Sequence, residues 1–459
     1  MSVGYFYNIV FLFITCCVWF ASRYFYPTKR RIVRLFVFFW LVNSLIIALN
    51  FITYDVLFTL KTFVYLTSFF LFGVLGLYLG SNGFITNHKV DPQNIKPFNP
   101  RSMVLMLSLS SIFLFYGYFD VMQKIPMMIS DFGALRASFW DEWLSVKEYS
   151  TWDAVLAFLQ GVSFFTFLSY CSPNTNTSSW LRVFAFSIAF LFVVQVLLIG
   201  GRSLIFYVVF ATLYLFSLFD IKPNRTSYVN NIKKIFLYCS VLSGVVFFML
   251  VFPALRSSVE YLDLNQFLSY RHYSQISDHI ESITRFFPIA DDIAFATDYF
   301  STPTVKMTNL IEELGTSNHY SLGAYSFSVP PKIISMFGGT NYHMEARFLL
   351  EDKIASQGYL AIRPWTTAAQ DFSSDFGLIG GVFFGFLSTY ILAKSYVWGL
   401  RANSAEGYAL STVVVLNLVV FAFKSPFNVT FIANTLFVSY FIFFLSKTVI
   451  KPRNVDCNV

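Results

Sequence analysis

Charged residues are scarce in this sequence: 12% of its 459 residues are Asp, Glu, Lys or Arg, whereas 56% are hydrophobic. Soluble globular domains carry about 25% charged residues. The scarcity excludes an ordinary soluble domain, and many apolar runs reach the roughly 20 residues that a transmembrane helix needs. A membrane barrel would instead show alternating segments of about 10 residues. We therefore predict an all-α polytopic membrane protein.

Cysteine is also scarce. The five cysteines lie in apolar runs, at the ends of such runs or in the C-terminal tail. No disulfide framework is therefore indicated. The sequence also lacks close metal-ligand spacings such as His-x3-His and the phosphate-binding pattern Gly-x4-Gly-Lys. We expect neither a metal site nor a resident cofactor.

Acidic residues are fewer than basic ones, 25 against 32. In a membrane protein, excess Lys and Arg usually mark cytoplasmic loops rather than an anionic partner, so we expect no nucleic-acid partner. Basic clusters occur at residues 29–34, 222–234 and 447–453. These clusters predict that the N-terminus lies outside the membrane and the C-terminus in the cytoplasm.

With these sides fixed, the apolar runs predict about eleven transmembrane helices. They span residues 5–19, 32–51, 62–79, 103–119, 155–171, 183–198, 204–219, 235–253, 376–393, 410–423 and 429–445. A first outer loop at 120–153 alternates aromatic and charged residues, which is typical of a segment lying along the membrane surface.

One long polar stretch, residues 256–375, interrupts this apolar sequence and holds four of the five histidines. We predict that it is a large outer loop carrying the active site. The chain then divides into an N-terminal transmembrane bundle (1–255, including the loop at 120–153), the large loop (256–375) and C-terminal transmembrane helices (376–459).

A Gly-Gly-Arg-Ser motif, residues 200–203, separates two apolar runs at the predicted outer face. Glycines allow close approach of a ligand to the backbone. The planar guanidinium of Arg202 can grip a lipid phosphate or pyrophosphate through two hydrogen bonds. A tight turn with an arginine reaching the membrane interface is the alternative interpretation.

Several motifs together resemble bacterial O-antigen polymerases of the Wzy type. They are the Gly-Gly-Arg-Ser motif, the segment DFSSDFGLIGG from Asp371 to Gly381, the segment Val329-Pro-Pro-Lys332, and the Arg-x10-Gly spacing of Arg347 and Gly358. The resemblance implies a GT-C-like fold and a metal-independent glycosyltransferase. Such an enzyme joins undecaprenyl-pyrophosphate-linked oligosaccharide repeat units into O-antigen, the polysaccharide of lipopolysaccharide.

The resemblance also implies a location and partners. The protein would be a multi-pass protein of the bacterial inner (cytoplasmic) membrane, with its large loop in the periplasm. Its partners would be the undecaprenyl-pyrophosphate-linked oligosaccharide and membrane lipid. The sequence leaves open whether a chain-length regulator binds.

Transfer of a sugar from a lipid pyrophosphate needs cations for the leaving diphosphate and a base for the attacking hydroxyl. His343, Glu345 and Asp371 are the predicted catalytic residues, with His343 as the base. The predicted substrate-binding residues are Arg202, Arg271, His272, Arg285, Arg347, Arg363 and Trp365. Lone loop arginines are often merely solvated, and aromatic side chains near a bilayer often anchor it. Asp371 and Asp375 could instead cap the following helix.

Other functions remain open at this point. An O-antigen ligase has a closely similar plan, and residue spacing alone does not separate it from a polymerase. A flippase or secondary transporter would place charged groups inside several helices near the middle of the bilayer. A structural or receptor protein would not need arginines and histidines clustered beside the membrane.

Overall fold

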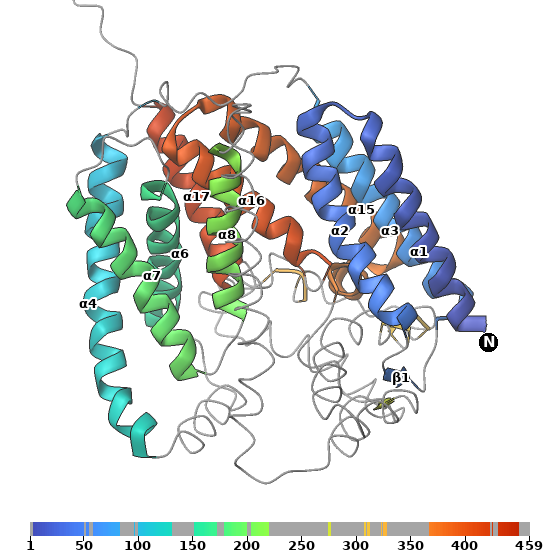
Figure 1. Ribbon diagram of the computed structural model, residues 1–459, viewed down its shortest axis with the longest axis horizontal. Helices are drawn as coiled ribbons and strands as arrows, with labels where there is room; N and C mark the ends of the chain where they lie inside the picture. The colour runs from blue at the N-terminus through green and yellow to red at the C-terminus, as the bar shows by residue number, and fades with distance from the viewer. Residues whose placement is uncertain are drawn as a thin grey trace, which may run out of the picture.

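The structure is a computed structural model, shown in Figure 1. It describes residues 3–49, 52–54, 58–82, 96, 100–130, 151–171, 179–199, 203–219, 274–276, 307–308, 310–312, 323, 325–327, 367–422, 425 and 430–448. These residues are mostly helical. The α-helices are α1 (Val3–Ala21), α2 (Pro27–Leu49), α3 (Leu60–Gly80), α4 (Pro100–Ser130), α6 (Thr151–Tyr170), α7 (Ser179–Ile199), α8 (Ser203–Phe219), α15 (Ala368–Ala402), α16 (Ala405–Val420) and α17 (Thr430–Thr448).

The helices have the length and composition of a membrane protein. Five helical segments are long and apolar enough to cross a bilayer: Gly4–Tyr24, Lys29–Leu49, Leu60–Gly80, Arg101–Lys124 and Ala368–Ala402. Exposed Phe and Leu side chains on these segments, such as Phe13 and Phe115, suit contact with lipid. The predicted class, a helical membrane protein, is confirmed.

Each described α-helix overlaps one of the predicted spans, and the span predicted at 235–253 lies outside the described residues. One boundary differs from the sequence prediction. Helix α15 begins at Ala368, whereas hydropathy places the start of its apolar run at residue 376. Asp371 and Asp375 therefore lie inside a helix and not in a loop.

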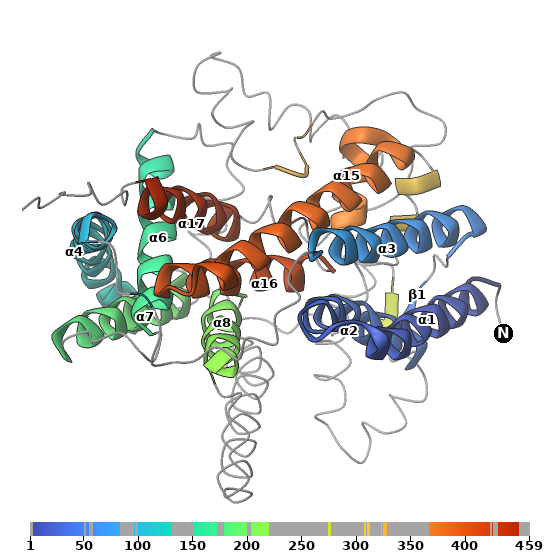
Figure 2. The same ribbon diagram turned by 90° about the horizontal axis from the view of Figure 1, so that it is seen from above.

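Two groups of helices flank a central pair. Seen from above, α15 and α16 cross the middle of the molecule, with α1, α2 and α3 on one side and α4, α6, α7 and α17 on the other (Figure 2). Helix α3 packs along α15, α16 packs along α15 and α17, and α17 packs on α6. This arrangement encloses α16, whose residues are all buried.

Glycines allow α3 and α15 to lie very close together. A Cβ atom added to Gly76 of α3 would lie 2.3 Å from Oγ1 of Thr389, and one added to Gly80 would lie 2.4 Å from the carbonyl oxygen of Tyr390. On α15, Gly381 and Gly385 face Tyr65 and Phe69 of α3 in the same way. Small residues spaced four apart are the usual means of close packing between membrane helices.

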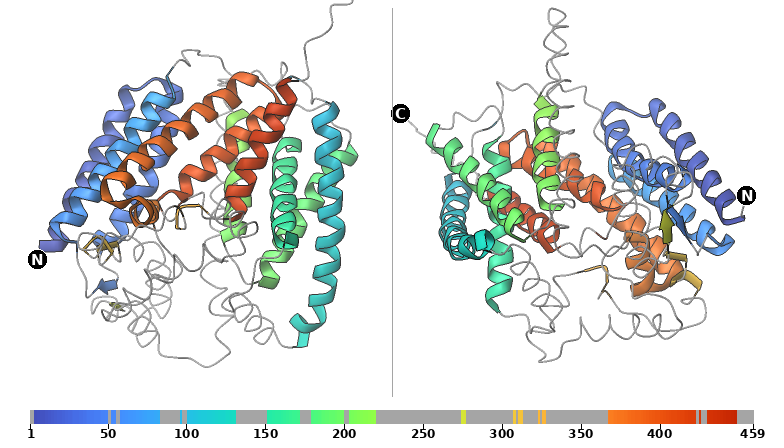
Figure 3. Two further views of the ribbon diagram at one scale, coloured as in Figure 1. Left: turned by 180° about the vertical axis from the view of Figure 1, so that it is seen from behind. Right: turned by 60° about the horizontal axis from the view of Figure 1, so that its bottom comes forward.

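Helices α1 to α8 run in alternating directions along the chain, and so do α15 to α17, so that the helix termini gather at two ends of the bundle (Figures 1 and 3). We call the end at which α15 begins the loop end. The short strand β1 (Ile52–Tyr54) follows α2 there and pairs antiparallel with β2 (Ser274–Ile276), with Ile52 opposite Ile276. This pairing fixes a piece of the long polar stretch at the loop end.

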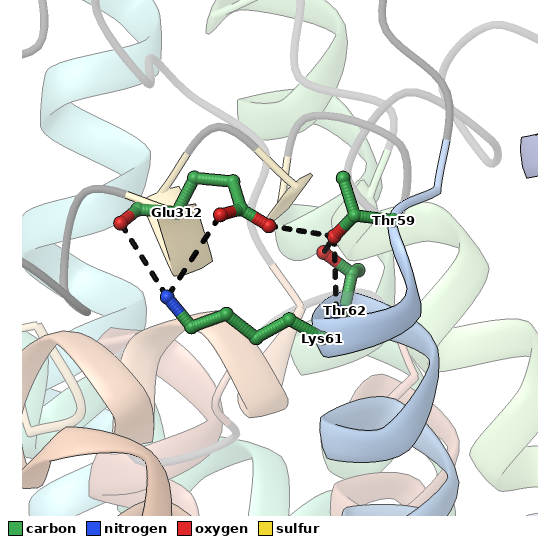
Figure 4. Close-up of polar contacts among 4 residues, drawn as sticks. All are labelled: Thr59, Lys61, Thr62 and Glu312. Carbon is green, nitrogen blue, oxygen red and sulfur yellow. Dashed lines mark hydrogen bonds and ion pairs between the residues drawn. The ribbon is translucent and has the colours of Figure 1, made fainter.

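A second piece of the polar stretch is fixed at the start of α3 (Figure 4). Thr59 caps this helix by accepting a hydrogen bond from the N–H of Thr62, and its hydroxyl donates to Oε1 of Glu312 at 2.7 Å. Nζ of Lys61 lies 3.9 Å from Oε2 of Glu312. Because both charged groups are exposed, the ion pair contributes little stability by itself. The ion pair and the hydrogen bond from Thr59 instead position Glu312 beside the start of α3.

Candidate functional site

The first turns of α15 form a separate short helix. Thr367 is the N-cap, and its side chain accepts a hydrogen bond from the N–H of Gln370 at 3.1 Å. Gly377 then interrupts the helix with φ 71° and ψ 179°, a conformation that suits glycine alone. The sequence therefore builds a capped polar segment, residues 368–376, joined by a kink to the apolar part of α15.

Two aspartates lie one turn apart on this short helix, and each is 0% exposed. Oδ2 of Asp371 accepts a hydrogen bond from the N–H of Ser425 at 2.8 Å. Oδ1 of Asp375 accepts from the N–H of Tyr325 at 3.0 Å, and Oδ2 accepts from the N–H of Ser326 at 2.6 Å. Backbone N–H groups thus compensate part of the cost of burying these carboxylates.

Ser425 closes the arrangement, because its Oγ donates a hydrogen bond to the carbonyl oxygen of Ser326 at 2.7 Å. We call Asp371, Asp375, Tyr325, Ser326 and Ser425 the aspartate cluster. The cluster joins three parts of the chain: the start of α15, the polar stretch before it and the segment that follows α16. These buried hydrogen bonds fix the relative positions of the three parts.

Aromatic side chains pack beside the aspartate cluster. The ring of Phe372, which follows Asp371, lies 6.3 Å from the ring of Phe69 on α3 and 6.1 Å from that of Phe421 at the end of α16. The hydroxyl of Tyr65 on α3 donates to the carbonyl oxygen of Ala369 at 2.7 Å. These contacts hold the polar first turns of α15 against the membrane helices.

Of the predicted site residues, the structure describes Asp371. The others lie outside the described residues, and their roles stay predictions; they are Arg202, Arg271, His272, Arg285, His343, Glu345, Arg347, Arg363 and Trp365. The catalytic role of Asp371 also stays a prediction. What the structure adds is that this side chain holds the segment after α16.

The capping alternative for the two aspartates is wrong in one respect. The side chain that caps α15 is that of Thr367, while both aspartates accept hydrogen bonds from other parts of the chain. Sequence reasoning missed Ser425, Ser326 and Tyr65 as members or neighbours of the site. The sequence carries a weak signal for Ser425. This residue follows the apolar run 410–423, which is predicted to end on the outer side of the membrane, and α15 begins on the same side.

Among the residues that the structure describes, no group of three or more His, Cys, Asp or Glu side chains could hold a metal ion. In the aspartate cluster, both carboxylates are buried hydrogen-bond acceptors. It can orient backbone and side chains around the first turns of α15.

Comparisons with known proteins give no family for this chain. No protein-family model, no curated protein and no solved structure matches it. The resemblance to O-antigen polymerases therefore depends on the short motifs given above. The longest of them, Asp371 to Gly381, contains both buried aspartates and the glycine of the kink.

Proposed function

We propose that this protein is a membrane glycosyltransferase that joins undecaprenyl-pyrophosphate-linked oligosaccharide repeat units into O-antigen or a related surface polysaccharide. The observation that supports this best is the aspartate cluster. It is a built polar centre at the end of the helical bundle, it includes part of the long polar stretch, and its two aspartates lie within the motif that resembles O-antigen polymerases. The GT-C-like arrangement of about eleven helices belongs to the same proposal.

The distribution of basic residues supports a periplasmic loop end. In the described part of the chain, most Lys and Arg residues lie near the opposite end of the bundle: Arg23, Lys29, Arg30, Arg31, Arg34, Lys96, Arg101, Arg182, Lys394 and Arg401. Lys61 and Lys124 lie towards the loop end. By the positive-inside rule the basic end faces the cytoplasm. A lipid-linked donor is then expected at the loop end, because nucleotide sugars are cytosolic.

In the proposed reaction, an acceptor sugar hydroxyl attacks the anomeric carbon of the donor repeat unit. The bond from that carbon to the pyrophosphate oxygen breaks, and undecaprenyl pyrophosphate leaves. His343 takes the hydroxyl proton, with Glu345 and Asp371 supporting it. Cationic and ring side chains hold the diphosphate and the sugars; they are Arg202, Arg271, His272, Arg285, Arg347, Arg363 and Trp365.

The position of buried charges favours an enzyme over a transporter. Among the described residues, the buried charged side chains are Lys29, Asp371, Asp375 and Glu406, and each lies in the first turns of its helix. A transporter is expected to carry such groups near the middle of the bilayer. The described helices instead concentrate their buried charges at the two ends of the bundle.

The test compares the lipid-linked glycans of cells with and without the gene. We expect single repeat units on undecaprenyl pyrophosphate to accumulate in the deletion strain, and polymer to return when the gene is restored. Full-length chains left on the carrier would instead indicate a ligase. Unchanged glycans would contradict both enzymatic functions.

A further inference from the structure

Gln370 is a buried amide that the aspartate cluster does not use. Its side chain is 1% exposed, and neither Nε2 nor Oε1 has a hydrogen-bond partner among the residues that the structure describes. A buried polar group without a partner destabilises the folded protein, because it has lost its hydrogen bonds to water. Such a group in a native structure calls for a specific explanation.

Helix capping does not explain this side chain. Thr367 and Gln370 have the spacing of a capping box, in which the threonine oxygen accepts from the N–H of the glutamine and the glutamine side chain bonds back to the N–H of the threonine. The first bond is present at 3.1 Å. The return bond is not made, since both polar atoms of the Gln370 amide are unpaired in the described part of the chain.

A second unpaired polar group lies on the segment that contacts this turn. The hydroxyl of Thr367 donates to the sulfur of Met307 at 3.6 Å, which places residues 307 and 308 beside the start of α15. Thr308 is 2% exposed, and its Oγ1 is without a partner within the described ranges. The first turn of α15 and the segment covering it therefore both carry unsatisfied hydrogen-bonding groups.

The chemistry of these groups selects the ligand. A neutral amide offers one acceptor and a two-proton donor, which matches a pair of neighbouring sugar hydroxyls. A phosphate is disfavoured, because the carboxylate of Asp371 follows Gln370 directly in the chain. A cation is disfavoured, because it would leave the NH2 group of Gln370, which can only donate, without an acceptor.

We infer that Gln370, with Thr308, binds hydroxyl groups of the oligosaccharide when the contact between Met307 and Thr367 opens. This inference rests on the proposed function, since it assigns part of the glycan to the loop end of the bundle. It makes Gln370 a substrate-binding residue in addition to those predicted from the sequence.

The test substitutes Gln370→Met, which keeps the length of the side chain and removes its polar atoms. Purified protein is assayed with undecaprenyl-pyrophosphate-linked repeat units extracted from the deletion strain. Loss of hydrogen bonds to two hydroxyls should raise KM about 10-fold. The melting temperature should stay the same or rise, because the substitution removes an unsatisfied buried amide. Gln195→Met on α7, beside Gly117 of α4, is the matched control and should change neither quantity.

Each other outcome overturns the inference. An unchanged KM would show that Gln370 does not meet the glycan. A lower melting temperature would show that the amide has a structural role, such as holding a buried water molecule. If the unmodified protein forms no polymer, the proposed function fails separately. Direct binding of the lipid-linked repeat unit to the wild type and to Gln370→Met then tests whether Gln370 contacts the glycan. Equal binding by wild type and Gln370→Met would reject the assignment.

Discussion

Asp375 illustrates how a carboxylate can be buried at the end of a membrane helix. Both of its oxygens accept backbone N–H groups, at 3.0 Å from Tyr325 and 2.6 Å from Ser326. Hydrogen bonds to a charged acceptor are stronger than those between neutral groups, so they offset part of the desolvation cost. Replacing one carboxylate oxygen of Asp375 should therefore lower the stability of the protein more than so small a change in the side chain suggests.

We predict that Asp375→Asn lowers stability by about 1–3 kcal/mol, because the amide NH2 of asparagine then faces a backbone N–H that needs an acceptor. Asp120→Asn is the control: Asp120 pairs with Lys124 one turn away on α4, at 2.7 Å and partly exposed. An exposed pair of this kind contributes about 0.5 kcal/mol. Thermal unfolding in detergent checks both variants. If Asp375→Asn and Asp120→Asn lose equal stability, the hydrogen bonds from Tyr325 and Ser326 to Asp375 do not form.

Asp371 shows that a candidate site residue can be predicted from the sequence although its hydrogen-bond partners cannot. Its residue type and its place near the end of the polar stretch singled it out from the sequence. Its partner Ser425 is 54 positions away, and the partners of Asp375 are 50 and 49 positions away. Such contacts depend on how α15, α16 and the polar stretch pack together, and no local pattern encodes that packing.

Helix α15 shows how far a secondary-structure element can be predicted from the sequence. Its apolar part was predictable, because hydropathy detects residues that face lipid. Its first turns were not, because Thr367 to Asp375 is a polar segment with the composition of a loop. The structure buries this segment inside protein, where hydrogen bonds to other segments replace water. Hydropathy carries no information about that kind of burial.

The contact between α3 and α15 provides a test at the level of these two helices. We predict that Gly76→Ala destabilises the protein by about 1–3 kcal/mol, because the new Cβ would meet Oγ1 of Thr389 at 2.3 Å and the carbonyl oxygen of Phe386 at 2.5 Å. Backbone at the contact cannot yield as a side chain can. Thermal unfolding of the purified protein measures the change.

Gly117→Ala is the matched control for this prediction. The Cβ added to Gly117 of α4 would meet Cδ2 of Leu191 at 2.7 Å, the end of a flexible side chain. We expect a smaller loss of stability than for Gly76→Ala. If the two variants lose equal stability, α3 and α15 are not packed as closely as described.

For the whole molecule, the separation of charge between the two ends of the bundle predicts its orientation. The described basic side chains concentrate near the starts of α2 and α4 and near the turn from α15 to α16, where Lys96 N–H bonds to the carbonyl oxygen of Asn403 at 2.9 Å. The described pieces of the polar stretch lie at the loop end, around β2 and Glu312. The positive-inside rule assigns these two ends to opposite sides of the membrane.

We therefore predict that a reporter inserted near Ser317 is periplasmic and that one fused after Lys451 is cytoplasmic. Alkaline phosphatase, active only outside the cytoplasm, and a cytoplasm-specific fluorescent protein measure the two sides in parallel. A third fusion after Ser81, between α3 and α4 at the basic end, is the control and should score with Lys451. Opposite results at Ser317 and Lys451 would overturn the lipid-linked donor as well, because the polar stretch would then face the nucleotide sugars of the cytoplasm.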